Sequence, residues 1–142
     1  MKGKWVEYTY RCRFFDDISG FFCELPKIPI ELSLGGKIFP TDGVIDSGCS
    51  RTHIRRDIAE FFAIDTSRLE RATTHGIAGS EEGFLQKITL SVINHGKPFE
   101  VEALIVGILP VPVLLGTNDF FTKFDVRFER SKQHFYVKRV QE

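Results

Sequence analysis

An aspartate, a serine and a glycine end an apolar stretch in residues 43–54, which read GVIDSGCSRTHI. A carboxylate at the junction of a buried strand and a tight turn costs desolvation free energy unless hydrogen bonds or chemistry use its charge. Two interpretations of Asp46 are open at this point. Asp46 and Ser47 could cap a turn or the following helix, as these residue types often do. Alternatively, Asp46 could exchange protons with a substrate as a general acid or base.

Other candidate catalytic groups are weaker. The four histidines, His53, His75, His95 and His134, lack the HExxH pattern or any comparable ligand spacing, so we expect no metal site. No glycine-rich phosphate loop joins a strand to a helix, and we expect no cofactor. Cys49 could act as a nucleophile with a distant histidine, but lone cysteines are more often buried, small apolar groups.

Composition and charge narrow the class of partner. The 142 residues predict a single domain spanning 1–142. The 19 basic and 19 acidic residues give a formal net charge of zero, which argues against nucleic acid or an anionic membrane as the main partner. The most apolar window, residues 103–116, is too short to span a bilayer and contains two prolines.

Three cysteines cannot all pair with one another, and an odd number fits a reducing compartment. The first ten residues lack the apolar segment of a secretory signal peptide. We therefore expect a cytoplasmic protein.

Alternating apolar and polar residues predict a chain made mostly of β-strands. A half-buried strand is expected over 6–14, followed by a turn at 16–20 and an apolar segment at 21–25. Gly35 and Gly36 predict a two-residue hairpin turn between strands that end near Leu34 and begin near Ile38. Helical spacing of apolar residues predicts one helix within 53–64. Further strands are expected over 84–93, 99–106 and 111–116, with a hairpin over 124–140. The pattern is typical of an antiparallel barrel or sandwich.

Three segments occur in an order that resembles a known family. They are VIDSG at 44–48, HGIAGSEEG at 75–83 and VLLG at 113–116. Together they resemble the retropepsin-like, single-lobe aspartic proteases of retroviruses and their cellular and bacterial relatives. The resemblance covers about residues 26–140 and implies an all-β, closed barrel with one short helix, assembled as a two-fold homodimer. Residues 1–25 form an extension, which we expect to add a hairpin.

The resemblance also implies roles for individual residues. Asp46 would be the catalytic carboxylate, Ser47 would steady the turn across the dimer, and Gly48 would allow the sharp turn. The family's flap, which covers bound peptide, would correspond to Gly76, Ile77, Ala78 and Gly79. The second loop motif would correspond to Leu114, Leu115 and Gly116. The chain departs from the family pattern at Cys49, Ala78 and Asn118, where alanine, glycine and aspartate are usual.

The implied activity is that of an aspartic-type endopeptidase acting on a peptide or protein substrate. Two carboxylates held close together share one proton, so that one activates water while the other donates a hydrogen bond to the scissile carbonyl. The sequence contains one Asp-Ser-Gly, so such a pair requires Asp46 from each of two chains. The alternative is a non-catalytic dimeric module that keeps the fold and binds extended peptides.

Overall fold

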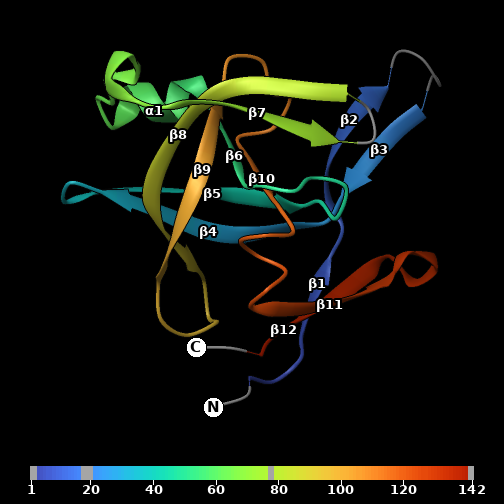
Figure 1. Ribbon diagram of the computed structural model, residues 1–142. Coiled ribbons are helices and arrows are strands. Elements are labelled where there is room, and N and C mark those ends of the chain that lie inside the picture. Colours follow the sequence, from blue (N-terminus) through green and yellow to red (C-terminus); the bar gives the residue numbers. More distant parts are fainter. Residues whose placement is uncertain (1–2, 17–20, 77–78, 141–142) are drawn as a thin grey trace.

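The computed structural model describes residues 3–16, 21–76 and 79–140 (Figure 1), and these are mostly β-strands. The strands are β1 (Val6–Thr9), β2 (Arg11–Asp16), β3 (Phe21–Leu25), β4 (Lys27–Leu34), β5 (Lys37–Ile45), β6 (His53–Arg55), β7 (Arg71–Gly76), β8 (Gly79–Val92), β9 (Phe99–Val106), β10 (Val113–Leu115), β11 (Phe124–Glu129) and β12 (His134–Arg139). The described residues contain one α-helix, α1 (Arg56–Phe61), and two 3₁₀ turns, η1 (Thr66–Arg68) and η2 (Arg130–Lys132). No helix among them is long and apolar enough to cross a bilayer.

The largest sheet brings distant parts of the chain together in the order β4-β5-β10-β6-β9-β8-β7. Strand β4 pairs with β8 as well as with β5, so the sheet curls back towards its own first strand. Strand β10 lies between β5 and β6, parallel to β5 and antiparallel to β6. The loop that joins β5 to β6 therefore has to pass over the end of β10.

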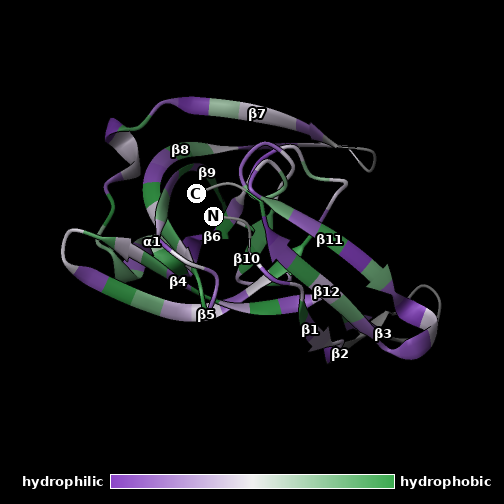
Figure 2. Cartoon of the chain, turned by 90° about the horizontal axis from the view of Figure 1, so that it is seen from below, coloured by the Kyte–Doolittle hydropathy of each residue, from purple (hydrophilic) through white to green (hydrophobic). Residues whose placement is uncertain are grey.

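Alternation along the strands builds the core. In β4, Ile28, Ile30 and Leu32 are buried while the residues between them are partly exposed, as expected for a strand with one face in the core. The same alternation of hydrophobic and hydrophilic residues is visible along β11 in Figure 2. The side chains of three phenylalanines, Phe120, Phe124 and Phe135, extend the core towards the sheet formed by β1, β12 and β11.

The glycine pair at 35–36 forms the predicted hairpin turn. Leu34 pairs with Lys37, and Gly35 and Gly36 have φ angles of +58° and +79°. A turn with two positive φ angles matches the twist of its strands, and glycine adopts it without steric cost. The prediction is confirmed.

The predicted helix begins later than the periodicity indicated. Residues His53–Arg55 form strand β6, and α1 begins at Arg56. Ile54 pairs with Val113 of β10 and with Ile105 of β9, so it lies in the centre of the sheet. Backbone pairing on both sides of β6 therefore outweighs the local helical spacing.

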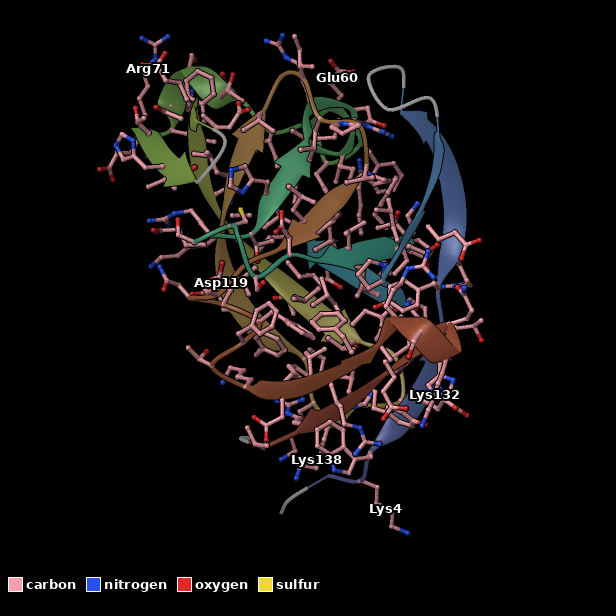
Figure 3. All side chains as sticks on the ribbon, turned by 90° about the vertical axis from the view of Figure 1, so that its right-hand side faces the viewer. Lys4, Glu60, Arg71, Asp119, Lys132 and Lys138 are labelled. Atoms are coloured by element: carbon pink, nitrogen blue, oxygen red, sulfur yellow. The ribbon has the colours of Figure 1, made fainter. Side chains whose placement is uncertain are left out.

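The strand expected over 6–14 is divided at Tyr10. Strand β1 pairs with β12, whereas β2 pairs with β3 in a separate two-stranded sheet. Part of the predicted turn at 16–20, residues 17–20, lies outside the described residues. Strand β1 is tied to the main sheet by Tyr8, whose hydroxyl lies 2.7 Å from Nε2 of the buried His95. Figure 3 shows the β1–β12–β11 sheet at one end of the molecule, near Lys4 and Lys138.

Candidate active site

Asp46 follows the buried end of β5. Ile45 is 4% exposed and pairs with Leu115 of β10, and the Asp46 amide donates to the Leu115 carbonyl at 3.1 Å. The Asp46 carboxylate accepts a hydrogen bond from the Gly48 amide at 2.9 Å. This bond closes a local turn of the kind expected from a capping aspartate. The carboxylate is nevertheless only partly buried, so it also remains open to the space in front of the turn.

Two loops cross behind Asp46 and hold each other through backbone hydrogen bonds. The Thr117 amide donates to the Cys49 carbonyl at 2.8 Å, and the Asn118 amide donates to the Ser50 carbonyl at 2.9 Å. The loop after β10 is thus bound along the loop that carries Asp46. Such pairing fixes the position of a carboxylate more firmly than an isolated turn does.

Asp119 adds a side-chain hydrogen bond to this crossing. Its Oδ2 accepts from the Thr52 amide at 2.8 Å. The family pattern usually has an aspartate at the neighbouring position, which is Asn118 in this chain. Asp119 was missed, and the only signal for it was an acidic residue one position further along the chain.

Gly116 lies where the two loops approach most closely. A Cβ atom at this position would lie 2.5 Å from the carbonyl carbon of Arg51 and 2.6 Å from its oxygen. Atoms of another loop's backbone cannot move aside easily, so only glycine fits here. Of the other two residues in the predicted loop motif, Leu115 is fully buried and Leu114 is partly exposed.

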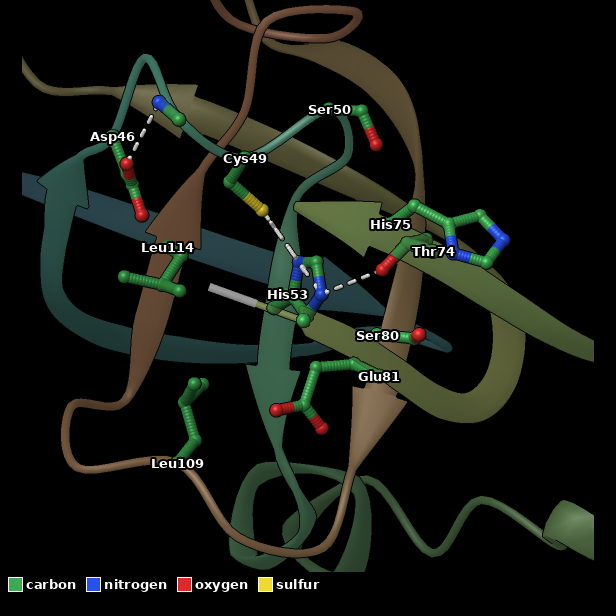
Figure 4. A pocket seen from close by; sticks show the side chains of 12 residues that line it. Asp46, Cys49, Ser50, His53, Thr74, His75, Ser80, Glu81, Leu109 and Leu114 are labelled. Atoms are coloured by element: carbon green, nitrogen blue, oxygen red, sulfur yellow. Dashed lines mark hydrogen bonds between the residues drawn. The ribbon is translucent and has the colours of Figure 1, made fainter. Parts of the chain in front are cut away.

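A pocket of about 340 Å³ lies in front of Asp46 (Figure 4). Its lining comes from the loop after β5, strand β6, both arms of the β7–β8 hairpin, and the segment that leads into β10. The lining residues are Asp46, Gly48, Cys49, Ser50, His53, Thr74, His75, Gly79, Ser80, Glu81, Leu109 and Leu114. Ser47 is exposed and does not line the pocket.

The predicted flap segment forms a β-hairpin beside this pocket. Strands β7 and β8 pair from Arg71 and Phe84 up to Gly76 and Gly79. Gly79 has a φ angle of +139°, which a residue with a side chain rarely adopts. The residues between these ends, Ile77 and Ala78, lie outside the described residues. Of the two predicted flap residues that the structure describes, Gly76 and Gly79, it is Gly79 that lines the pocket.

Cys49 and His53 lie together on the floor of the pocket, which the sequence analysis did not foresee. The Cys49 Sγ atom is 3.0 Å from His53 Nδ1. Both atoms also contact the Arg51 carbonyl, at 2.9 Å and 2.7 Å. A carbonyl can only accept, so Nδ1 carries a proton and cannot take one from the thiol. The second ring nitrogen, Nε2, lies 3.2 Å from the Thr74 hydroxyl, which can donate to it.

This geometry argues against Cys49 as a nucleophile. Burial raises the pKa of the Cys49 thiol above its ordinary value, and the negative charges of Asp46, Asp119 and Glu81 raise it further. A thiol is a weak nucleophile until it loses its proton. Cys49 and His53 therefore form a hydrogen-bonded floor and not an activated pair.

Among the described residues, no three histidine, cysteine, aspartate or glutamate side chains gather in a way that could hold a metal ion. The Asp46 carboxylate lies in the pocket next to the loop crossing and is partly exposed. A carboxylate in such a position can act as a general base on water.

Comparisons with known proteins place the fold. No protein-family model and no curated protein matches the chain. The structure is similar to the crystal structure of a retropepsin-like aspartic protease from Rickettsia conorii, with a TM-score of 0.60 and 17% sequence identity. The alignment covers 94% of this chain and 98% of that chain. The chain thus has a retropepsin-like fold, as the resemblance implied, and its described residues are mostly β-strands with one α-helix. Function has to be argued from the site.

Proposed function

We propose that this protein is an aspartic-type endopeptidase that hydrolyses peptide bonds with water activated by two Asp46 carboxylates, one from each chain of a homodimer. One observation carries the proposal. The Asp46 carboxylate stands at the end of a buried strand, held by a crossing of two loops, in a pocket bordered by a hairpin. The structural neighbour with a similar fold is an aspartic protease, and this analogy adds support to the proposed chemistry.

The reaction needs two carboxylates with different tasks. Two of them within a few ångströms share one proton, because ionising both costs too much electrostatic energy. The ionised one removes a proton from water, and the oxygen of that water attacks the scissile carbonyl carbon. The protonated one donates a hydrogen bond to the carbonyl oxygen and stabilises the charge that develops there. When the tetrahedral intermediate collapses, the C–N bond breaks and the carboxyl group that took the proton from water gives a proton to the leaving nitrogen. No metal or organic cofactor is needed for these steps.

The proposed site requires a homodimer because the chain has a single Asp-Ser-Gly motif. The chain carries one Asp-Ser-Gly, so a second Asp46 has to come from a second copy across a two-fold axis. Ser47 is exposed at the same turn. In the proposed dimer its hydroxyl would steady the turn across the interface, as the resemblance implies. Gly48 serves the site through its amide, which bonds the carboxylate.

Dilution tests this assembly directly. We expect specific activity on a peptide substrate to fall as the protein is diluted below its dimer dissociation constant, because monomers lack a complete site. Sedimentation velocity over the same concentrations should show the dimer fraction falling in parallel. Adding an inert carrier protein at each dilution controls for loss to surfaces. A monomer with full specific activity would contradict the two-chain site.

A second candidate function has one observation in its favour. The bond between the Gly48 amide and the Asp46 carboxylate gives Asp46 a structural role without catalysis. On that basis the chain would be a non-catalytic dimeric module that binds extended peptides beside the β7–β8 hairpin. Peptide binding without any hydrolysis, unchanged by loss of the Asp46 charge, would favour it.

The remaining proposals concern organisation and location. We propose one domain over 1–142, with residues 1–25 as an extension and the strands of the main sheet closed into a barrel, which the additional β4–β8 pairing supports. A reducing compartment such as the cytoplasm remains the proposed location, because three cysteines cannot all pair.

A further inference from the structure

The pocket beside Asp46 is lined by two carboxylates and by no lysine or arginine. Asp46 and Glu81 both line the pocket (Figure 4), and no lysine or arginine is among the lining residues. The Glu81 carboxylate has no hydrogen bond or ion pair with any described residue. Burial raises the pKa of the Cys49 thiol on the pocket floor, and the negative charges of Asp46, Glu81 and Asp119 raise it further. A ligand group that enters this pocket therefore meets a negative potential.

The hydrogen-bonding groups on the floor are already occupied. His53 is 3% exposed, and both of its ring nitrogens have partners, in the Arg51 carbonyl and the Thr74 hydroxyl. The Cys49 thiol donates to the same carbonyl. The Asp46 carboxylate accepts a hydrogen bond from the Gly48 amide and, under the proposed function, takes part in the reaction. Of the two carboxylates that line the pocket, Glu81 is thus the one that remains available to recognise a substrate.

Apolar side chains line another part of the same pocket. Leu109 and Leu114 come from the segment that leads into β10 and from β10 itself. Two leucines beside the Glu81 carboxylate form a surface that fits an amphipathic side chain with an aliphatic stem and a positively charged end. Lysine and arginine are the side chains with that character.

We infer that this pocket is a specificity subsite that accepts a lysine or arginine next to the scissile bond, with Glu81 as the residue that sets the preference. The inference rests on the proposed function, since it names the class of peptide that the same site would cleave. The stem would pack on Leu109 and Leu114, and the cationic group would pair with Glu81. A charge-assisted hydrogen bond to an exposed carboxylate such as Glu81 is strong enough to favour such a substrate about two- to fivefold.

The neighbouring glutamate provides a matched control. Side chains alternate between the two faces of a strand, so Glu81 and Glu82 point to opposite sides of β8. Glu82 lines a different pocket, with Arg71 and Phe84, and does not touch the one that contains Asp46. Both residues are exposed. Removing either charge changes the net charge equally, and only Glu81→Gln removes it from the subsite.

The experiment compares matched peptides. A peptide that the wild-type protein cleaves is resynthesised with lysine, arginine, norleucine or glutamate at each position that flanks the cut. We expect kcat/KM to be about two- to fivefold higher for lysine than for norleucine, which has the same stem without the amine, at one of these positions. Glu81→Gln should reduce this ratio to near one, whereas Glu82→Gln should preserve it. The ratio should also fall as salt is raised, because Glu81 is exposed.

The outcomes separate this inference from the proposed function. Cleavage that depends on Asp46, with no lysine or arginine preference or with the same preference in Glu81→Gln, overturns the inference and leaves the protease standing. If no peptide is cleaved in an Asp46-dependent way, the proposed function fails. Dissociation constants of the same peptides for wild type and Glu81→Gln then decide the inference. Loss of a lysine preference in the variant upholds it, and equal affinities overturn it.

Discussion

Replacing Asp46 with asparagine is expected to reduce kcat/KM for peptide hydrolysis by about 10³–10⁴-fold, in the range seen when one member of a catalytic set is removed. Asparagine has nearly the same shape as aspartate, but its amide neither accepts a proton from water nor shares one with the partner's Asp46. The side-chain oxygen of asparagine can still accept from the Gly48 amide, which lies 2.9 Å from the carboxylate. The turn, the dimer and the melting temperature should therefore change little.

A suitable control is Asp42→Asn. Asp42 lies on the same strand, β5, four residues before Asp46, and forms a surface ion pair with Arg11 at 3.1 Å. Surface ion pairs contribute little to stability, so this variant should keep activity within about twofold of wild type. Initial rates of both variants and wild type on one fluorogenic peptide make the comparison. Activity near wild type in Asp46→Asn would remove Asp46 from the mechanism.

Replacing Gly116 with alanine is expected to lower the stability of the protein substantially. The added Cβ would come within 2.6 Å of the carbonyl carbon and oxygen of Arg51, so the two crossing loops would have to separate. Overpacking of this kind costs about 1–3 kcal/mol in the free energy of unfolding, and backbone atoms place this site at the upper end. For a chain of this size, that corresponds to a fall in Tm of about 10 °C. Because the crossing positions Asp46, kcat should fall at least about tenfold even below Tm.

Gly107 offers the matched control for Gly116. A Cβ at Gly107 meets no atom within 4 Å, so Gly107→Ala should leave Tm within about 1 °C of wild type. Thermal unfolding followed by circular dichroism compares the two variants and wild type. Equal melting temperatures for Gly116→Ala and wild type would mean that the crossing tolerates a side chain, and the structural account of the site would be wrong there.

Local sequence patterns predicted much of the fold, because the residues that determine a hairpin or a strand lie close together in the sequence. The strand expected over 99–106 matches β9, and the glycine pair at 35–36 forms the expected turn. The hairpin over 124–140 is present, with its turn at Arg130–Lys132 and Gln133 in the left-handed region. In each case, the residues that pair are close in sequence, so alternation and turn chemistry suffice.

Pairing between strands that are distant in sequence determines the two features that local patterns predicted wrongly. Ile54 has the spacing of a helical residue, but two strands from the second half of the chain enclose it in the sheet. The interruption at Tyr10 likewise depends on β12, more than a hundred residues away in sequence. A single sequence contains no signal for either partner, so the periodicity alone gave the wrong start for the helix and one strand in place of two.

The candidate site was predictable only in outline. The order of the three segments predicted that Asp46, the hairpin and the β10 loop would come together, and Asp46, Gly79 and Leu114 line one pocket. The floor made by Cys49, His53 and Thr74 was not predicted, because Thr74 lies on a strand 21 residues away from His53. The position of Glu81 in the pocket likewise depends on tertiary packing, which places β8 beside the loop that carries Asp46.

The distance between the two Asp46 carboxylates in a crystal structure of the protein at a concentration where it is dimeric tests the central claim most directly. The account predicts a two-fold dimer in which carboxylate oxygens of the two Asp46 side chains lie about 2.5–3.0 Å apart, the separation of two groups that share a proton. The exposed Ser47 hydroxyls should lie at the same interface. Carboxylates separated by many ångströms in the dimer, or a monomer at every concentration tested, would contradict it.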